Sequence, residues 1–393
     1  FVTQTAATGV YTNIDNVSII EITTDTNLPR ISYENFSYDG SGNIIPNSGC
    51  GSWLFEPQST NLITQSELFS DSSWFKSNST IVSNEIVSPD GTLNASKITA
   101  TSTSQPRAEF SYPVPLVDTK NTFSLFVKKG NTSYIALSRF SGSQSAIFDL
   151  DTISVVSQSS ENATIKEMGN GWFRVSITQT VLSTDASNRW KINLTNGIST
   201  NIGVVGEYVY IWGGQLEQQS YATSYIPTSG STVTRNQDLC TNGGSLASIN
   251  STEGTLYFEG AALANDLTDR TIALSDGTTS NTVRIQYLTV SNAIWATVTN
   301  IGAGGNQAIL QYTSPDITIN SKVALKYKEN DFSLWVNGVE VATDTSGVTF
   351  PANTLNTLQF DRGNGAQNFF GKTKALAVFP YLTDSELTAL TTI

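Results

Sequence analysis

The sequence predicts an all-β protein with two antiparallel β-sandwich domains of the jelly-roll kind behind a short N-terminal attachment segment. The first observation is that only 14% of the residues are charged, while Ser, Thr and Asn fill most polar positions. Helix surfaces are usually built from Lys, Glu, Gln and Arg, whereas Ser, Thr and Asn suit strands and turns. The second is that short alternating apolar and polar segments recur between Gly, Asn, Ser and Asp turns. The third is an aromatic content of 10%, which favours packed cores over disorder.

The chain length of 393 residues accommodates two or three domains of roughly 150 residues each. We expect residues 1–50 to form a lead-in segment with a strand-like stretch at 17–22. Residues 51–245 are expected to form the first sandwich. Its strands alternate on a period of two, as half-buried strands do. They are expected at 123–127, 134–140, 146–150, 172–178, 189–194 and 208–212.

Loop-like stretches near 228–250 separate this domain from a second sandwich, expected at 246–393. Asn337-Gly338 between two alternating stretches predicts a tight β-hairpin. Thr383 followed three positions later by Glu386 is a capping box, which predicts one short helix at about 383–390. The expected strands are 254–259, 271–274, 282–287, 293–298, 322–327, 332–336 and 355–360.

Composition excludes several kinds of chemistry. The chain has no His, so imidazole bases, Ser-His-Asp triads and His-ligated metals are excluded. Its two Cys are too few for a zinc cluster. The net charge of −12 argues against a nucleic-acid partner. No apolar run approaches the roughly 18 residues of a membrane span, so no membrane insertion is expected.

Two long strings stand near the ends of the first expected sandwich, Glu56-Pro-Gln-Ser-Thr-Asn-Leu62 and Ala222-Thr-Ser-Tyr-Ile-Pro-Thr228. Shorter strings accompany them: Leu28-Pro-Arg-Ile-Ser-Tyr33, Ser66-Glu-Leu-Phe-Ser-Asp71, Gly171-Trp-Phe-Arg-Val-Ser176 and Thr234-Arg-Asn-Gln-Asp-Leu-Cys240. Together they resemble an assembly that recurs in tail, fibre and other appendage proteins of bacteriophages. The resemblance covers most of residues 1–245. It implies that the first sandwich is similar to the jelly rolls of carbohydrate-binding modules.

Residues 250–393 carry a second, less specific set of strings. They are Val323-Ala-Leu-Lys-Tyr327, Leu334-Trp-Val-Asn-Gly-Val-Glu-Val341 and Lys374-Ala-Leu-Ala-Val-Phe-Pro-Tyr-Leu-Thr-Asp-Ser-Glu-Leu387. This part resembles a concanavalin-like or laminin-G-like sandwich. The resemblance implies binding of a sugar or receptor, and it carries no particular site.

Aromatic side chains are the first candidates for sugar contacts, since sugars stack on Trp or Tyr while polar groups bond their hydroxyls. Trp74 lies in a polar stretch, and Trp190 follows Arg189 and precedes a lysine. Trp74, Trp190 and Arg189 are therefore the candidate carbohydrate-binding residues, with core packing as the alternative for both indole rings. Core packing is expected for the tryptophans inside alternating apolar strands, which are Trp172, Trp212 and Trp335.

Catalytic carboxylates are not predicted. Glycoside hydrolysis needs two carboxylates facing one cleft, about 5–9 Å apart. Asp149 and Asp151 are the close alternating acidic pair in a strand-like context, and we interpret them as turn residues. The protein is therefore expected not to be an enzyme.

The laminin-G-like resemblance also raises the question of calcium, because such sandwiches often bind one Ca²⁺ through loop oxygens. Loop-like carboxylates are the candidate ligands: Asp266, Asp269, Asp276 and Asp344. They lack the fixed spacing of an EF-hand loop, so solvated turn acids are the favoured alternative. No other cofactor is expected.

Cys50 and Cys240 flank the first expected sandwich, within the strings that carry the resemblance. A disulfide between them would close a long loop and stabilise the fold. Assembly of a particle in a bacterial cytoplasm favours free thiols instead. Both states remain open.

These observations predict a bacteriophage virion appendage protein, a head or tail fibre component on the particle surface. It would bind host cell-surface polysaccharide without covalent chemistry and contact other virion proteins. A homotrimer is expected, because linked weak sites gain avidity. One alternative is a purely structural virion protein, with large apolar patches and no aromatic-lined groove. The other is a polysaccharide depolymerase or the accessory module of a glycanase, with two carboxylates in one cleft.

Overall fold

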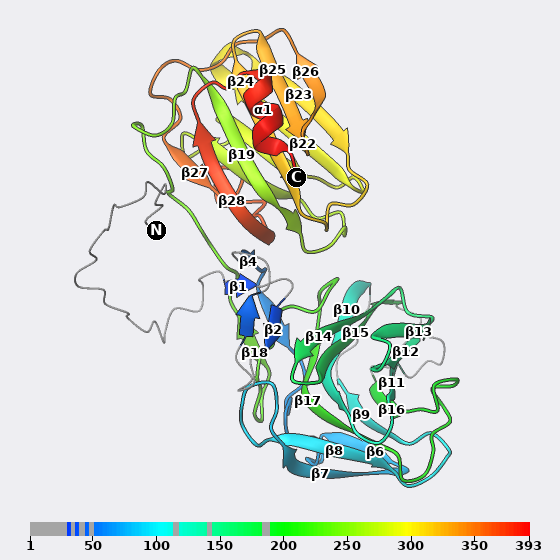
Figure 1. The fold of residues 1–393 in the computed structure, drawn as a ribbon. Coiled ribbons are helices and arrows are strands. Elements are labelled where there is room, and N and C mark those ends of the chain that lie inside the picture. The colour runs from blue at the N-terminus through cyan, green and yellow to red at the C-terminus, as the bar shows by residue number, and fades with distance from the viewer. Residues whose placement is uncertain are drawn as a thin grey trace, which may run out of the picture.

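The computed structural model describes residues 51–112, 118–139, 144–182 and 189–393, and the backbone of three short strands before them. These are β1 (Arg30–Ser32), β2 (Phe36–Tyr38) and β3 (Ile44–Pro46). The strand expected at 17–22 lies outside the described residues. The described residues form two antiparallel β-sandwiches, one above the other in Figure 1, with β1, β4 (Ser52–Phe55) and β18 (Val233–Arg235) between them. The all-β fold class is therefore correct.

The first sandwich consists of two sheets packed face to face. One sheet, which we call the cleft sheet, has the order β14–β15–β10–β17–β8–β7. Its strands in that order are Asn162–Gly169, Trp172–Val181, Thr119–Lys129, Tyr208–Glu217, Ala95–Ala100 and Ser79–Ile86. The opposite sheet has the order β13–β12–β11–β16–β9–β6. Its strands are Ser154–Gln158, Ser145–Asp149, Tyr134–Arg139, Arg189–Leu194, Arg107–Ser111 and Trp74–Ser77.

The second sandwich also pairs two sheets. The larger has the order β1–β4–β28–β19–β24–β25–β26, where β28 to β26 are Gly371–Phe379, Glu253–Ala262, Ser321–Lys328, Asp331–Val336 and Val339–Asp344. The smaller has the order β23–β22–β21–β20–β27. Its strands are Gly305–Thr313, Ala293–Asn300, Asn281–Tyr287, Arg270–Ser275 and Thr357–Gln359. The strand expected at 355–360 is thus shorter than predicted.

One strand crosses the expected domain boundary. β4 was expected in the first sandwich, but it pairs with β28 in the large sheet of the second, and β1 pairs with β4 in turn. The chain then returns to the first sandwich through β5 (Ser59–Asn61), which pairs with β18. A separate hairpin joins β2 and β3. The two sandwiches therefore share chain at their junction.

The alternation of side chains explains which face of the cleft sheet is buried. On β10, Phe123, Leu125 and Val127 point into the first core together with Val175 and Ile177 of β15. Neighbouring residues point to the opposite face of the sheet because successive side chains of a strand alternate. This outer face carries Phe126, Trp172 and Trp212, which form a small apolar cluster of their own.

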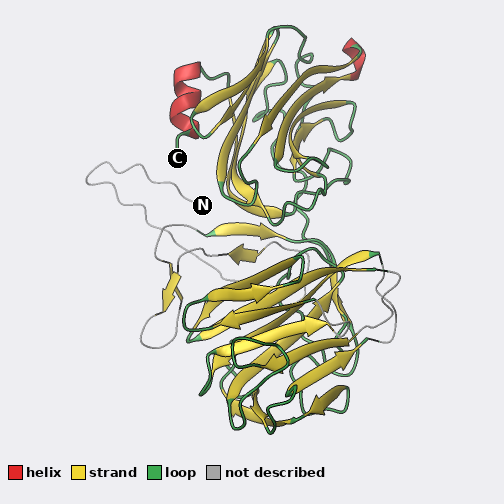
Figure 2. Ribbon diagram, turned by 90° about the vertical axis from the view of Figure 1, so that its right-hand side faces the viewer, coloured by secondary structure: helices red, strands yellow, loops and turns green. Residues whose placement is uncertain are grey.

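The local turn and helix predictions are confirmed. Asn337 and Gly338 have φ values of 51° and 85° and join β25 to β26, as a type I′ hairpin requires. The helix α1 (Asp384–Thr391) begins after Thr383, whose capping box with Glu386 is formed. Figure 2 shows α1 on the outside of the second sandwich, and η1 (Ile301–Ala303) is a single 3-10 turn. No described helix is long and apolar enough to cross a membrane.

Candidate functional site

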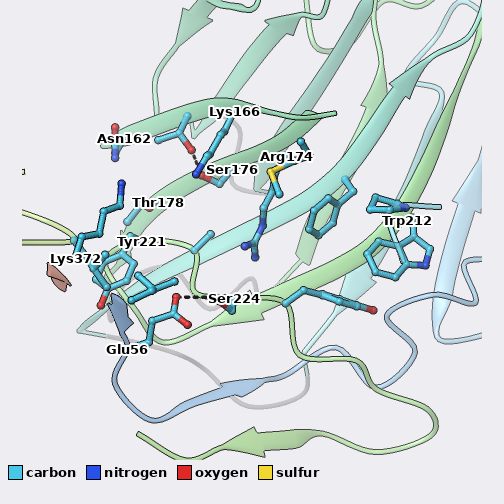
Figure 3. A pocket seen from close by; sticks show the side chains of 18 of the residues that line it. Glu56, Asn162, Lys166, Arg174, Ser176, Thr178, Trp212, Tyr221, Ser224 and Lys372 are labelled. Carbon is cyan, nitrogen blue, oxygen red and sulfur yellow. Dashed lines mark hydrogen bonds between the residues drawn. The ribbon is translucent and has the colours of Figure 1, made fainter. Parts of the chain in front are cut away.

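A cleft of about 570 Å³ lies on the outer face of the cleft sheet (Figure 3). This volume falls in the ordinary range for small-molecule sites, about 300–1,000 Å³. Its floor comes from β10, β14, β15 and β17. Its walls come from the turn at Pro89 and Asp90, the segment 221–225, Glu56 after β4, and two residues of the second sandwich, Leu263 and Lys372.

Aromatic rings form one side of the cleft. The Trp212 and Tyr225 ring centroids are 4.5 Å apart, and the Phe126 centroid lies 5.2 Å from that of Trp212. Tyr225 is fixed through its hydroxyl, which hydrogen-bonds Ser66 Oγ at 2.6 Å and Glu67 Oε1 at 3.1 Å. The rings therefore make a rigid apolar wall.

A glycine pair allows this wall to form. The pairing of β10 with β17 shifts by one residue between Ser124 and Phe126, opposite Gly213 and Gly214. Gly213 has a φ of 63°, and a Cβ there would lie 2.9 Å from the Phe126 ring and 3.2 Å from Tyr225. A side chain at this position would clash with two rings, so the bulge needs glycine.

Arg174 supplies a fixed positive charge beside the rings. Its Nη1 donates to the Thr223 carbonyl at 2.6 Å and its Nη2 to Ser124 Oγ at 3.0 Å. The guanidinium carbon lies 5.2 Å from the Phe126 centroid. Burial lowers the pKa of Arg174, while the charges of Glu217 and Glu56 oppose that shift. The guanidinium remains charged at neutral pH, because arginine starts from so high a pKa.

Hydroxyl groups line the remaining floor. On β15, Ser176 and Thr178 follow Arg174 at every second position and face the cleft. Thr164 of β14 shares a 2.6 Å hydrogen bond with Ser176. A row of hydroxyls beside aromatic rings and a cation can bond the hydroxyls of a sugar while a ring face stacks on its apolar side.

The two most specific strings of the sequence meet at the cleft. Glu56 Oε1 accepts from the Ser224 amide at 2.8 Å. Asn61 Nδ2 donates to the Ile226 carbonyl at 2.8 Å, and Asn61 Oδ1 accepts from the Leu216 amide at 3.2 Å. Nearby, Ser59 donates to the buried carboxylate of Glu217 at 2.6 Å. These bonds hold the segment 221–225 against the end of β17, and so they position Tyr225 in the aromatic wall.

The two carboxylates that line the cleft are engaged by the protein. Glu56 is 3% exposed and pairs with Arg235 at 3.3 Å in addition to the Ser224 amide. Asp90 accepts from Ser88 at 2.5 Å and from the Thr92 amide at 2.8 Å. Burial raises the pKa of Asp90, but hydrogen bonds from Ser88, Thr92 and Asn94 outweigh it, so the pKa is lowered. A general acid needs the opposite shift.

The predicted sugar platforms are corrected. Trp74 and Trp190 are each 1% exposed and pack in the core of the first sandwich, so neither ring presents a face to solvent. The charged neighbours of Trp190 mark strand alternation, because Ile192 points inward with it while Arg189 and Lys191 point outward. Arg189 lies 3.5 Å from Glu109 on the opposite sheet and does not line the cleft. The expected burial of Trp172, Trp212 and Trp335 is confirmed, although Trp172 and Trp212 pack in a small cluster on the outer face of the cleft sheet.

The expected calcium ligands are also separated. Asp266 pairs with Arg270 at 2.8 Å, Asp269 accepts from Gln367 at 2.7 Å, and Asp276 accepts from the Thr278 amide at 2.9 Å. Asp344 accepts from the Ser346 amide. Among the described residues, no three His, Cys, Asp or Glu side chains form a cluster that could hold a metal ion. Three of these carboxylates cap turns or form an ion pair, and Asp269 bonds a glutamine side chain.

Two further predictions concern the acidic pair Asp149 and Asp151 and a disulfide between Cys50 and Cys240. Asp149 accepts from the Asp151 amide at 3.0 Å and from Thr152 at 2.9 Å, which confirms the turn. Cys240 is exposed and has no disulfide partner among the described residues. Cys50 lies outside them, so the expected pairing is not tested.

Comparisons with known proteins give distant likenesses. No protein-family model matches the chain, and no curated protein sequence matches it. The sialyllactose-bound CBM40 of the Ruminococcus gnavus IT-sialidase is similar over 36% of this chain and 83% of its own, with 19% identity and a TM-score of 0.31. The pentraxin of Limulus polyphemus covers 38% and 72%, with 10% identity and a TM-score of 0.31. Mouse laminin α1 domains LG4-5 cover 71% and 91%, with 11% identity and a TM-score of 0.26. Such distant likenesses carry no conclusion about a ligand.

Proposed function

We propose that this chain is a non-catalytic glycan-binding protein and that the cleft on the cleft sheet holds the saccharide. The observation that carries the proposal is the convergence of three kinds of group on one space of about 570 Å³. The partly exposed Tyr225, backed by Trp212, offers an apolar wall, Arg174 offers a fixed cation, and Ser176 with Thr178 offers hydroxyls. Sugars need this combination of stacking and directed hydrogen bonds.

The lining carboxylates support binding over hydrolysis. Glycosidases keep one carboxylic acid protonated and leave a second carboxylate free to act on the sugar. Here Glu56 is tied to Arg235 and the Ser224 amide, and hydrogen bonds lower the pKa of Asp90. Both groups serve to hold the walls of the cleft, which is why we propose no catalytic residue.

The biological setting of the proposal is a bacteriophage particle, where the chain would attach the virion to host cell-surface polysaccharide. The support is the resemblance of Glu56–Leu62 and Ala222–Thr228 to phage appendage proteins, together with their position at the cleft. A homotrimer on the particle surface, in contact with other virion proteins, would multiply weak sugar affinity through avidity. Light scattering on the purified chain should give three times the mass of one chain, and a monomer at micromolar concentration would contradict the trimer.

An occluding substitution tests the proposed site. Thr164 is exposed at the mouth of the cleft on the edge strand β14, so Thr164→Trp should fill the cleft without disturbing the core. We expect binding on a glycan array in the native chain and at least about tenfold weaker binding in the variant, because a loss of 1.4 kcal/mol suffices for that factor.

The control for this substitution is Ser157→Trp. Ser157 is an exposed residue on β13, the edge strand of the opposite sheet, so it carries the same change in bulk away from the cleft. Equal binding by the two variants would remove the cleft as the site. No binding of the native chain to any glycan would overturn the proposed function and favour a purely structural virion protein.

A further inference from the structure

The cleft on the first sandwich is completed by the second sandwich. Leu263 follows β19, and Lys372 lies on β28. Lys372 is held there by backbone pairing, since Lys372 stands opposite Leu54 of β4 in the antiparallel register, and Leu54 itself lines the cleft. A side chain on the second sandwich is thereby fixed at the mouth of the first.

A hydrogen bond ties the sandwiches together next to this point, and an ion pair within the second sandwich fixes its acceptor. Ser220 donates to Asp266 Oδ2 at 2.5 Å, and Asp266 Oδ1 pairs with Arg270 at 2.8 Å. Burial raises the pKa of the neighbouring Tyr221 phenol, which lines the cleft as a neutral group. Because these contacts join the two sandwiches, Lys372 lies at the cleft in the absence of a ligand.

Cations outnumber carboxylates in the lining of the cleft. Three cations line it: Lys166 from β14, Arg174 from β15 and Lys372 from β28 (Figure 3). Lys166 is exposed and Lys372 is partly exposed. Of the two lining carboxylates, Glu56 is 3% exposed behind the wall, where Arg235 pairs with it. Asp90 is exposed, and it accepts hydrogen bonds from Ser88, Thr92 and Asn94. A ligand entering the cleft therefore meets more positive than negative groups, in a chain whose net charge is −12.

Two donor atoms in the lining of the cleft are left without an acceptor in the part of the chain that the structure describes. Two buried polar atoms of cleft-lining side chains have no hydrogen-bond partner among the described residues, Arg174 Nε and Trp212 Nε1. Both are donors, and a buried donor without an acceptor costs free energy. Each of the two atoms exposes less than 1 Å², so a ligand oxygen would reach them only after a shift of the surrounding side chains.

We infer that the ligand is an acidic saccharide whose carboxylate lies among Lys166, Arg174 and Lys372. This inference rests on the proposed function and names its ligand class. A carboxylate on a sugar ring supplies the acceptor oxygens and the negative charge, while the ring face remains available for the wall of Trp212 and Tyr225. A ligand bound by both sandwiches would also account for the pairing of β28 with β4, which places the second sandwich beside the cleft.

The test measures binding of the full chain to matched pairs of glycans by calorimetry. Each pair contains a carboxylated polymer, such as polygalacturonate or a sialylated glycan, and its carboxyl-reduced counterpart, with dextran sulfate as the sulfated arm. We expect the carboxylated member of at least one pair to bind about tenfold tighter than its reduced counterpart. One well-formed hydrogen bond between charged groups contributes about as much free energy as a tenfold change in affinity. Its affinity should fall as salt is raised.

The matched variants are Lys372→Gln and Lys374→Gln. Lys374 lies two residues further along β28, is exposed and does not line the cleft, so both variants remove one positive charge from the same strand. We expect Lys372→Gln to weaken binding of the carboxylated glycan about threefold to fivefold, as one partly exposed ion pair does, and Lys374→Gln to leave it within error. Thermal unfolding of both variants checks that the fold is unchanged.

The remaining outcomes distinguish this inference from the proposed function. Neutral glycans that bind as well as acidic ones, and lose binding in Thr164→Trp, would keep the glycan site and overturn the acidic ligand. A preference for dextran sulfate over every carboxylated glycan would overturn the carboxylate. Equal effects of Lys372→Gln and Lys374→Gln would remove Lys372 from the site. No binding to any glycan would overturn both proposals.

Discussion

Trp190 and Trp212 illustrate how the role of a side chain depends on the face of its strand. Both are almost fully buried, at 1% and 4% exposed. Trp190 packs between the sheets of the first sandwich, with the Phe123 centroid 5.9 Å away. Trp212 packs on the outer face of the cleft sheet, where its ring lines the cleft. The first is therefore a stability residue and the second a candidate binding residue.

This difference predicts the effect of Trp190→Ala. Removal of a fully buried indole should destabilise the protein by about 3–5 kcal/mol in urea unfolding, through lost apolar burial and the cavity left behind. Glycan binding by the folded fraction should be unchanged, because Trp190 does not reach the cleft.

Phe75→Ala provides the control for this measurement. Phe75 lies on β6 at 56% exposure, so its loss should change the free energy of unfolding by about 0.5 kcal/mol or less. Equal stability losses in the two variants, or weaker binding in folded Trp190→Ala, would contradict the assigned roles.

Residue-scale predictions from the sequence succeeded for core tryptophans and failed for the site. Polar neighbours around Trp74 and Trp190 suggested exposed rings, yet on a strand a polar neighbour marks the other face. Arg174 lies on β15 between Phe173 and Val175, which both point into the core. Its outward position follows from alternation, but its bonds to the Thr223 carbonyl and Ser124 come from segments far away in the sequence. No local pattern contains that geometry.

At the scale of elements, alternation and turn chemistry were sufficient for most strands. Period-two segments predicted β10, β15 and β17, and Asn337-Gly338 predicted the hairpin of β25 and β26. The pairing of β4 with β28 was not predictable, because it joins residues more than 300 positions apart without a local signal. That pairing brings Lys372 to the cleft, so the sequence did not predict that residues of both sandwiches line it.

The two specific strings of the sequence contact each other in the fold. Glu56–Leu62 and Ala222–Thr228 lie at opposite ends of the first sandwich in sequence and are hydrogen-bonded to each other in the fold. Asn61 alone bonds the Gly214 and Ile226 carbonyls and the Leu216 amide. The hydrogen bonds between the two strings account for their polar residues, and the same bonds build one wall of the cleft.

At the scale of the whole molecule, both sandwiches line the proposed binding cleft. The first contributes the aromatic wall, Arg174 and the hydroxyl row, and the second contributes Leu263 and Lys372. The net charge of −12 disfavours non-specific adsorption to anionic surfaces. In such a chain, Lys166, Arg174 and Lys372 supply the local positive charge on which the inferred acidic ligand depends.

The most direct test of the proposed glycan site is a crystal structure of the full chain with the tightest glycan from the array. We predict that a sugar ring lies in the cleft against Trp212 and Tyr225, with an oxygen within hydrogen-bond distance of Arg174. A glycan bound to the second sandwich, or to the opposite sheet of the first, with the cleft unoccupied, would contradict the proposed glycan site.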